Sequence, residues 1–176
     1  MTHLDDIEAL IRDAFSPVEY PGDWCLRGSD EGDEPRAVEA EFRGKSDWRV
    51  LDPRFLDEAP RGLGSALSFF SDEALHFYLP AYMLADLRGL LQRVDVVFCL
   101  THGLDKMSGA EQINPRRYGP RTWSDYARYR FSVFDRAQAA SIAAYLAFQS
   151  DSGLYTEVER VRIAEALQSY WLQKAA

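Results

Sequence analysis

The chain has 176 residues and a formal net charge of −8, from 28 acidic and 20 basic residues. This length suits one domain with a substantial core, and 47% hydrophobic residues with 13% aromatic are typical of a globular protein. Nonspecific nucleic-acid binding and binding to an anionic membrane surface both require a positive field, so the charge excludes them and favours a basic protein partner. We expect a single helical domain over residues 1–176.

Targeting, redox and metal signals point to a simple cytoplasmic protein. The start Met-Thr-His-Leu-Asp-Asp lacks the basic and apolar regions of a signal peptide, and no apolar run reaches membrane-spanning length. The two cysteines, Cys25 and Cys99, do not form a disulfide framework, and Cys99 lies in an apolar run typical of a core. Two cysteines and three histidines offer no spacing for a tetrahedral site, so we expect no metal and no cofactor.

Helix signals separated by turns fill the first third of the chain. Thr2-x-x-Asp5 predicts a capping box, and the helix that it begins ends before Pro17. Shorter helices are predicted over about residues 35–42, after an acidic loop, and 52–56, where aspartate is followed by proline at the first helical position.

A helix over residues 71–87 is the element around which we expect the fold to be organised. Ser71 is a suitable N-cap, and the residues from 74 to 87 are apolar on nearly every face, which predicts burial. Pro80 cannot donate a hydrogen bond to the carbonyl four residues earlier, so it predicts a kink or the start of a second helix. The expected fold is a mainly α multi-helix bundle around this Pro-kinked helix.

Asp72, Glu73 and His76 form the first candidate site. Separations of three and four residues place them on one narrow face at the start of the central helix. A carboxylate–imidazole pair performs acid/base chemistry or binds a metal, which is one hypothesis for a small hydrolase. The alternative is a hydrogen-bonded histidine in a kinked helix.

The run of residues 94–100 is compatible with a buried strand or a short helix, and the neighbouring helices favour a helix. The alternative fold class is therefore α+β with a small sheet. His102 and Gly103 follow the run, and histidine in the last turn with glycine beyond it predicts a helix end. His102 with Asp105 is a second candidate catalytic pair, and the alternative role for His102 is capping.

Residues 114–123 are the one dense basic and aromatic segment of an acidic chain. Guanidinium groups bind carboxylates or phosphates and stack on rings, so an anion or a protein partner is one candidate ligand. The interpretation that we favour is that at least one of the three arginines pairs with a carboxylate of the body, with the two rings packed beneath, because an acidic domain offers many partners. Prolines and glycine stop the segment from forming a helix of its own, so other contacts must hold it. The segment contains Arg116, Arg117, Tyr118, Arg121 and Trp123.

Three further helix starts are predicted near the C-terminus. Thr122-x-x-Asp125 and Ser132-x-x-Asp135 match the capping-box type, and Thr156 is the expected cap of the last helix. The apolar stripe predicted to dock that last helix comprises Val161, Ile163, Leu167, Tyr170 and Trp171.

The phrase Phe77-Tyr78-Leu79-Pro80-Ala81-Tyr82, with residues 69–76, 131–138 and 142–146, resembles a family of small bacterial proteins catalogued only as a domain of unknown function. The resemblance covers most of the chain. It implies a bacterial source and a conserved fold, and it transfers no activity, cofactor or site residue.

Two functional hypotheses remain. The first is a non-catalytic binding or regulatory protein, for example an immunity-like partner of a basic protein, which small size, acidity and the lack of a compact catalytic motif favour. The second is a small hydrolase that uses His76 or His102 with Asp72, Glu73 or Asp105.

Overall fold

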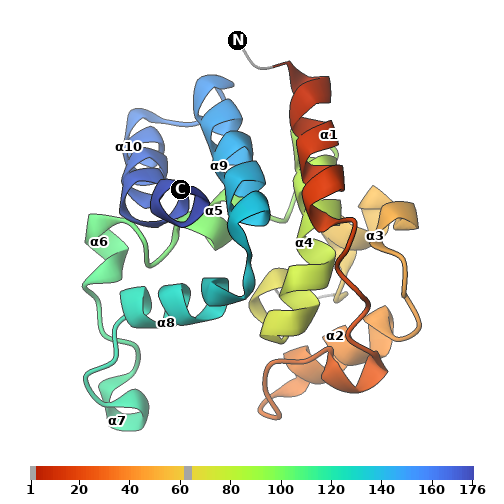
Figure 1. The fold of residues 1–176 in the computed structure, drawn as a ribbon. Helices are drawn as coiled ribbons and strands as arrows, with labels where there is room; N and C mark the ends of the chain where they lie inside the picture. Colours follow the sequence, from red (N-terminus) through yellow and green to blue (C-terminus); the bar gives the residue numbers. More distant parts are fainter. Residues whose placement is uncertain (1–2, 62–64) are drawn as a thin grey trace. The chain divides into compact units, whose positions relative to one another are not determined.

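The computed structural model describes residues 3–61 and 65–176, and these residues are mainly α-helical (Figure 1). No strand occurs in these two ranges. Among the described residues, β-type pairing is limited to the isolated bridges Arg27↔Phe70 and Gln112↔Thr122. The mainly α prediction is confirmed and the α+β alternative is wrong. Thr2, the predicted cap of the first helix, lies outside the described residues.

Contacts divide the chain into two compact units, an N-terminal unit, Ile11–Val96, and a C-terminal unit, Val97–Ala176 with the residues up to Leu10. The single domain expected over residues 1–176 stays a prediction. The helices from α1 to α4 are α1 (Leu4–Phe15), α2 (Asp33–Phe42), α3 (Pro53–Glu58) and α4 (Asp72–Leu87), with 3₁₀ turns at Asp23–Cys25, Trp48–Val50 and Ala66–Ser68.

The predicted central helix corresponds to α4, which runs without interruption through Pro80. The Ser71 hydroxyl accepts a hydrogen bond from the Ala74 N–H at 2.9 Å and so caps the helix as expected. Nearly all residues from Ala74 to Leu87 are buried. The Tyr78 ring stacks on Phe70 at a centroid distance of 5.1 Å and meets Phe42 edge-on at 4.9 Å. The α4 helix therefore supplies the aromatic core of the N-terminal unit.

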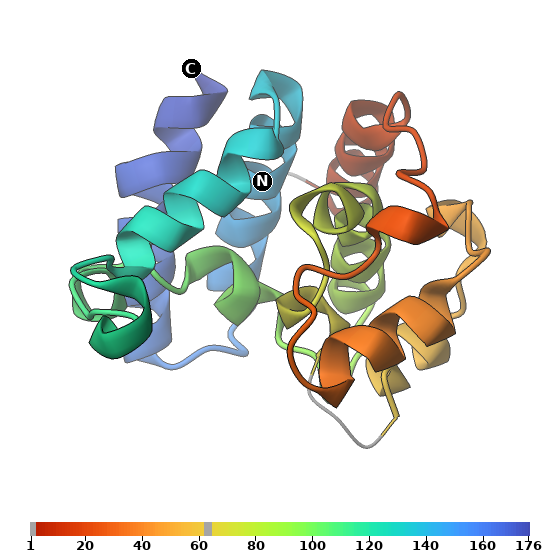
Figure 2. The same cartoon turned by 90° about the horizontal axis from the view of Figure 1, so that it is seen from below.

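The C-terminal unit is built from short helices around one long one. They are α5 (Val96–Thr101), α6 (Lys106–Gly109), α7 (Pro115–Tyr118), α8 (Trp123–Arg130), α9 (Arg136–Asp151), α10 (Glu157–Ala166), a π-helical turn (Leu167–Trp171) and α11 (Leu172–Ala175). Helices α9 and α10 lie side by side in both views of the ribbon (Figures 1 and 2). The helix favoured for residues 94–100 is confirmed as α5.

Two of the three predicted caps in this unit are confirmed. Thr122 and Thr156 each form a complete capping box at the start of α8 and α10. Ser132 is not a cap, because its hydroxyl donates to the carbonyl of Tyr129 within a 3₁₀ turn. Asp135 caps α9 instead, in a capping box with Gln138, because the carboxylate and the amide side chain satisfy each other's backbone N–H groups.

The apolar stripe predicted for the last helix is partly wrong. Val161 is 49% exposed, whereas Ile163, Tyr170 and Trp171 are buried. Positions two apart on a helix point in different directions, so Val161 and Ile163 cannot share one face. The π-helical turn then changes the register of the residues that follow it, which brings Tyr170 and Trp171 together into the core.

Candidate functional site

The basic and aromatic segment is a closed loop in the C-terminal unit. The Ile113 N–H donates to the Arg121 carbonyl at 3.0 Å, and the Trp123 N–H donates to the Glu111 carbonyl at 3.0 Å. Gln112 and Thr122 form an antiparallel bridge between these two bonds. Main-chain groups at the base therefore hold the loop. The sequence prediction assumed that arginine–carboxylate pairs were needed for this, and they are not.

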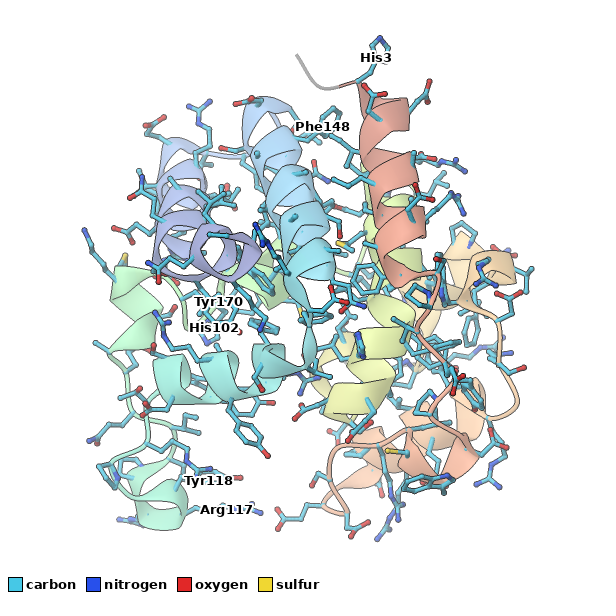
Figure 3. All side chains as sticks on the ribbon, viewed as in Figure 1. His3, His102, Arg117, Tyr118, Phe148 and Tyr170 are labelled. Atoms are coloured by element: carbon cyan, nitrogen blue, oxygen red, sulfur yellow. The ribbon has the colours of Figure 1, made fainter. Side chains whose placement is uncertain are left out.

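The tip of the loop is one helical turn, α7, which corrects the prediction that this segment forms no helix. Proline has no N–H to lose at the first helical position, so Pro115 begins the turn. The N–H groups of Arg117 and Tyr118 each donate to the Asn114 carbonyl at 3.0 Å. Gly119 ends the turn at a φ of 61°, a left-handed conformation that favours glycine. Figure 3 shows Arg117 and Tyr118 on this turn.

The arginines of the loop are exposed to solvent. Within residues 3–61 and 65–176, no ion pair joins Arg116 or Arg121 to a carboxylate of the body, so these two residues do not supply the predicted pairing. The guanidinium of Arg117 lies over the Tyr118 ring at 5.2 Å, and its pairing with a carboxylate stays a prediction. Tyr118 is 41% exposed, so its ring does not pack beneath the loop.

The positive charge of Arg121 influences Asp125, a residue in the first turn of α8. The pKa of Asp125 is lowered, chiefly by hydrogen bonds from the backbone N–H and the hydroxyl of Thr122, and further by the positive charge of Arg121. Asp125 is the capping-box carboxylate of α8. The loop presents its guanidinium groups outward from a base that its own backbone and Thr122 hold in place.

Trp123 connects the loop to the rest of the unit through His102. The half-buried His102 ring stacks on Phe98 at a centroid distance of 4.8 Å and meets Trp123 edge-on at 4.9 Å. Burial lowers the pKa of His102, although the charges of Asp105 and Glu111 act in the opposite direction. Because its ordinary pKa is already below 7, the ring is neutral at pH 7 and functions here as an aromatic packing element.

The Asp105 carboxylate caps the start of α6. Its carboxylate accepts hydrogen bonds from the N–H groups of Met107 at 3.0 Å and Ser108 at 2.9 Å, and one from the Ser108 hydroxyl. Burial would raise the pKa of Asp105, but these hydrogen bonds from Ser108 and Met107 lower it on balance. In the described part of the chain, no hydrogen bond or ion pair links the His102 ring to Asp105, so this pair lacks the contact that acid/base catalysis uses.

Gly103 allows the chain to turn between α5 and α6 against α8. Helix α5 ends at Thr101, as predicted from His102 and Gly103, and the φ of Gly103 is 84°. A Cβ atom at position 103 would lie 2.5 Å from the Trp123 carbonyl oxygen and 3.0 Å from the Ala127 Cβ. The Gly103 backbone can lie this close to the Trp123 carbonyl only because glycine has no side chain. This contact places Trp123, at the base of the loop, against the turn between α5 and α6.

The other candidate group lies in the first turns of α4. Asp72 and His76 are half-buried and Glu73 is exposed. The His76 ring meets Phe15 edge-on at a centroid distance of 6.2 Å. Among the described residues, the hollows of about 350, 220 and 150 Å³ are lined by none of these three side chains. A catalytic role for this group stays a prediction.

Two features of the described residues bear on cofactors and membranes. In residues 3–61 and 65–176, no three His, Cys, Asp or Glu side chains come together in an arrangement that would hold a metal ion. None of the described helices combines the length and the apolar character needed to span a bilayer. The expected lack of metal and cofactor stays a prediction.

The fold and this loop define a mainly α-helical protein with an exposed, backbone-braced basic and aromatic loop. By comparison of sequences, residues 3–175 match a family of unknown function, DUF6714, and the chain belongs to that family. No curated protein and no solved structure matches the chain.

Proposed function

We infer that the protein is a non-catalytic binding module. Its contact surface for an anionic segment of a protein partner is the loop of residues 111–123, called here the α7 loop. The observation that carries this proposal is that Arg116 and Arg121 are exposed, with no ion pair to any carboxylate of the described residues, on a loop held by its own backbone. Such guanidinium groups are available for bidentate binding of carboxylate or phosphate.

The composition of the loop tip supports a protein contact. Arginine and tyrosine are enriched where interfaces gain most of their binding energy. The Arg117 guanidinium over the Tyr118 ring orients two such side chains together on one helical turn. Because the turn is already formed, little conformational entropy is lost on binding.

Charge explains how one loop would select its partner. The chain carries a net charge of −8, so an anionic partner is repelled by the overall field and attracted at the loop. A basic or immunity-type partner would need an acidic surface instead, and it stays a separate prediction. A bacterial source, a cytoplasmic location and the hydrolase alternative also stay predictions.

Site-specific photo-crosslinking tests the proposal. A photoreactive phenylalanine analogue replaces Tyr118 in the full chain, and a matched control carries it at Leu154, which is also exposed and lies in the same unit. We expect a discrete crosslinked protein from position 118 alone, identified by mass spectrometry.

Charge reversal provides the second arm of this experiment. Combining Arg116→Glu and Arg121→Glu should abolish the crosslink, and Arg36→Glu on α2, an exposed arginine outside the loop, should leave it intact. Equal crosslinking from positions 118 and 154, or a crosslink that survives the double reversal, would show that the loop is not the contact surface.

A further inference from the structure

A small hollow in the N-terminal unit combines an apolar floor with a cationic rim. Its volume is about 150 Å³, and three arginines from separate segments line it, Arg12 on α1, Arg49 in the 3₁₀ turn and Arg88 at the end of α4. The floor includes Trp48, Leu56, Ala81, Leu84 and Ala85. Three guanidinium groups converge here in a chain that is acidic overall.

Buried side chains from three elements form the floor of the hollow. The five floor residues are all buried and come from α3, α4 and the turn at Trp48–Val50. Ala81 and Ala85 are one helical turn apart on α4, and their small side chains leave the space that the hollow occupies. Burying an apolar group against this floor removes apolar surface of both partners from water, which favours binding.

The rim offers hydrogen-bond donors for a negative group. Within residues 3–61 and 65–176, the Arg12 side chain is exposed and makes no hydrogen bond or ion pair. Arg49 lies over the Trp48 ring at 5.4 Å, donates to the Ser16 carbonyl at 3.4 Å and lies 3.5 Å from Asp47. Its position above the floor is thus set by neighbouring groups, and Arg88 adds a third positive charge.

Size and charge together define the ligand class. We propose that the hollow binds a small organic monocarboxylate, with its compact aromatic or branched apolar group on the floor and its carboxylate on Arg12 and Arg49. An engineered cavity of about 150 Å³ in another protein holds benzene, so the buried part is roughly six to eight non-hydrogen atoms. The same chemistry occurs in a free acid and in the C-terminal residue of a peptide.

The affinity expected for such a ligand is modest. A ligand of about ten non-hydrogen atoms is expected to bind with a Kd on the order of 0.1–1 mM. The site differs from the α7 loop in its residues and in its unit, so either proposal can fail without the other.

Titration with benzoate, monitored by amide chemical shifts in NMR, tests the proposal. We expect saturable shifts at Leu84 and Ala85, and at least about tenfold weaker binding of benzamide, which keeps the ring and lacks the charge. Arg12→Gln should weaken benzoate binding about fivefold to tenfold, because an exposed helix residue is replaced without loss of packing. Arg36→Gln on α2 should bind as the native chain does.

Two additions keep the test decisive and separate the ligand sources. Ala85→Leu should fill the hollow and abolish binding, and Arg12→Gln carries the test alone if that variant does not fold. A tripeptide ending in leucine is compared with its C-terminal amide. Tighter binding of the free-carboxylate peptide than of benzoate identifies a peptide terminus as the source, and the reverse order identifies a free acid. Equal binding of benzoate and benzamide, unchanged binding by Arg12→Gln, or no saturation by about 10 mM overturns the proposal.

Discussion

The indole Nε1 of Trp171 donates a hydrogen bond of 2.9 Å to the backbone carbonyl of Leu100. The indole is completely buried and packs on Phe131 and Phe134, so this bond joins the C-terminal π-helical turn to α5 inside the C-terminal unit. A buried carbonyl that loses its donor keeps the full cost of its desolvation.

Trp171→Phe should therefore lower the free energy of unfolding by about 2–4 kcal/mol, through the lost hydrogen bond and the smaller ring. Urea unfolding followed by circular dichroism measures the change. Trp24→Phe is the control, because Trp24 is 85% exposed and should change the value by less than about 0.5 kcal/mol. Equal effects of the two substitutions would refute the structural role assigned to the indole.

Asp57 holds the segment after α4 in the N-terminal unit. Its Oδ1 accepts hydrogen bonds from the N–H groups of Gln92 at 2.8 Å, Arg93 at 2.8 Å and Val94 at 3.2 Å. Asp57→Ala leaves these donors without their acceptor and should cost about 2–3 kcal/mol of stability. Asp57→Asn retains an acceptor oxygen and should cost less. Asp13→Ala, an exposed acid on α1, provides the baseline, and a loss no larger than that baseline would contradict the assignment.

The sign of the His102 shift predicts a loss of stability in acid. The pKa of His102 is lowered by burial in the folded state from its ordinary value of 6.5. Between the folded and the unfolded pKa the unfolded chain binds more protons, so the contribution of His102 is complete above pH of about 6.5 and falls as the pH decreases. His102→Gln should reduce the decline in melting temperature between about pH 7.5 and pH 5, and His3→Gln should not. An NMR titration that gives His102 a pKa above its ordinary value would end this explanation.

The arginines of the α7 loop should contribute little to stability. Arg116→Ala and Arg121→Ala are each expected to change the free energy of unfolding by about 0–1 kcal/mol, as solvated arginines do. Thr122→Ala removes the cap of α8 and should cost about 1 kcal/mol. Thermal melts of the three variants make the comparison. A loss of about 3–5 kcal/mol from either arginine would restore the internal-pairing interpretation.

Gly103 and Gly153 form a matched pair for a test of close packing. Both have positive φ, 84° and 78°, but a Cβ at position 153 would meet nothing within 4 Å, whereas one at position 103 would meet the Trp123 carbonyl at 2.5 Å. Gly153→Ala should cost about 1–2 kcal/mol from backbone conformation alone. Gly103→Ala should cost distinctly more, because backbone must move as well. Equal losses of unfolding free energy in the two variants would mean that the turn between α5 and α6 shifts at little cost, and would contradict the close packing assigned to Gly103.

Local signals in the sequence were sufficient for the main helices. The Ser71 cap and the apolar residues that follow it predicted α4, and the Thr122 and Thr156 capping boxes predicted α8 and α10, because each depends on residues within one turn. The start of α9 was placed wrongly at Ser132, because two cap residues compete there and only Asp135 has a reciprocal partner at the third helical position.

Features that depend on distant parts of the chain were not predictable. The sequence around Gln112 and Thr122 carries no strand pattern, because a single bridge needs only two backbone segments that return to the same place. Arg12, Arg49 and Arg88 are far apart in the sequence and meet only in the folded N-terminal unit. The exposure of Arg116 and Arg121 does not follow from the sequence for a different reason. The chain has many acidic residues, so its sequence favours internal pairing of these arginines.

The closed base of the α7 loop has a consequence for how this protein can change over time. Backbone hydrogen bonds between residues 111–113 and 121–123 need no particular side chains at the tip. On the function proposed above, mutations at positions 116–118 would change the contact surface while the neighbouring helices keep their packing. The loop would then be the place where relatives with the same helices acquire different partners.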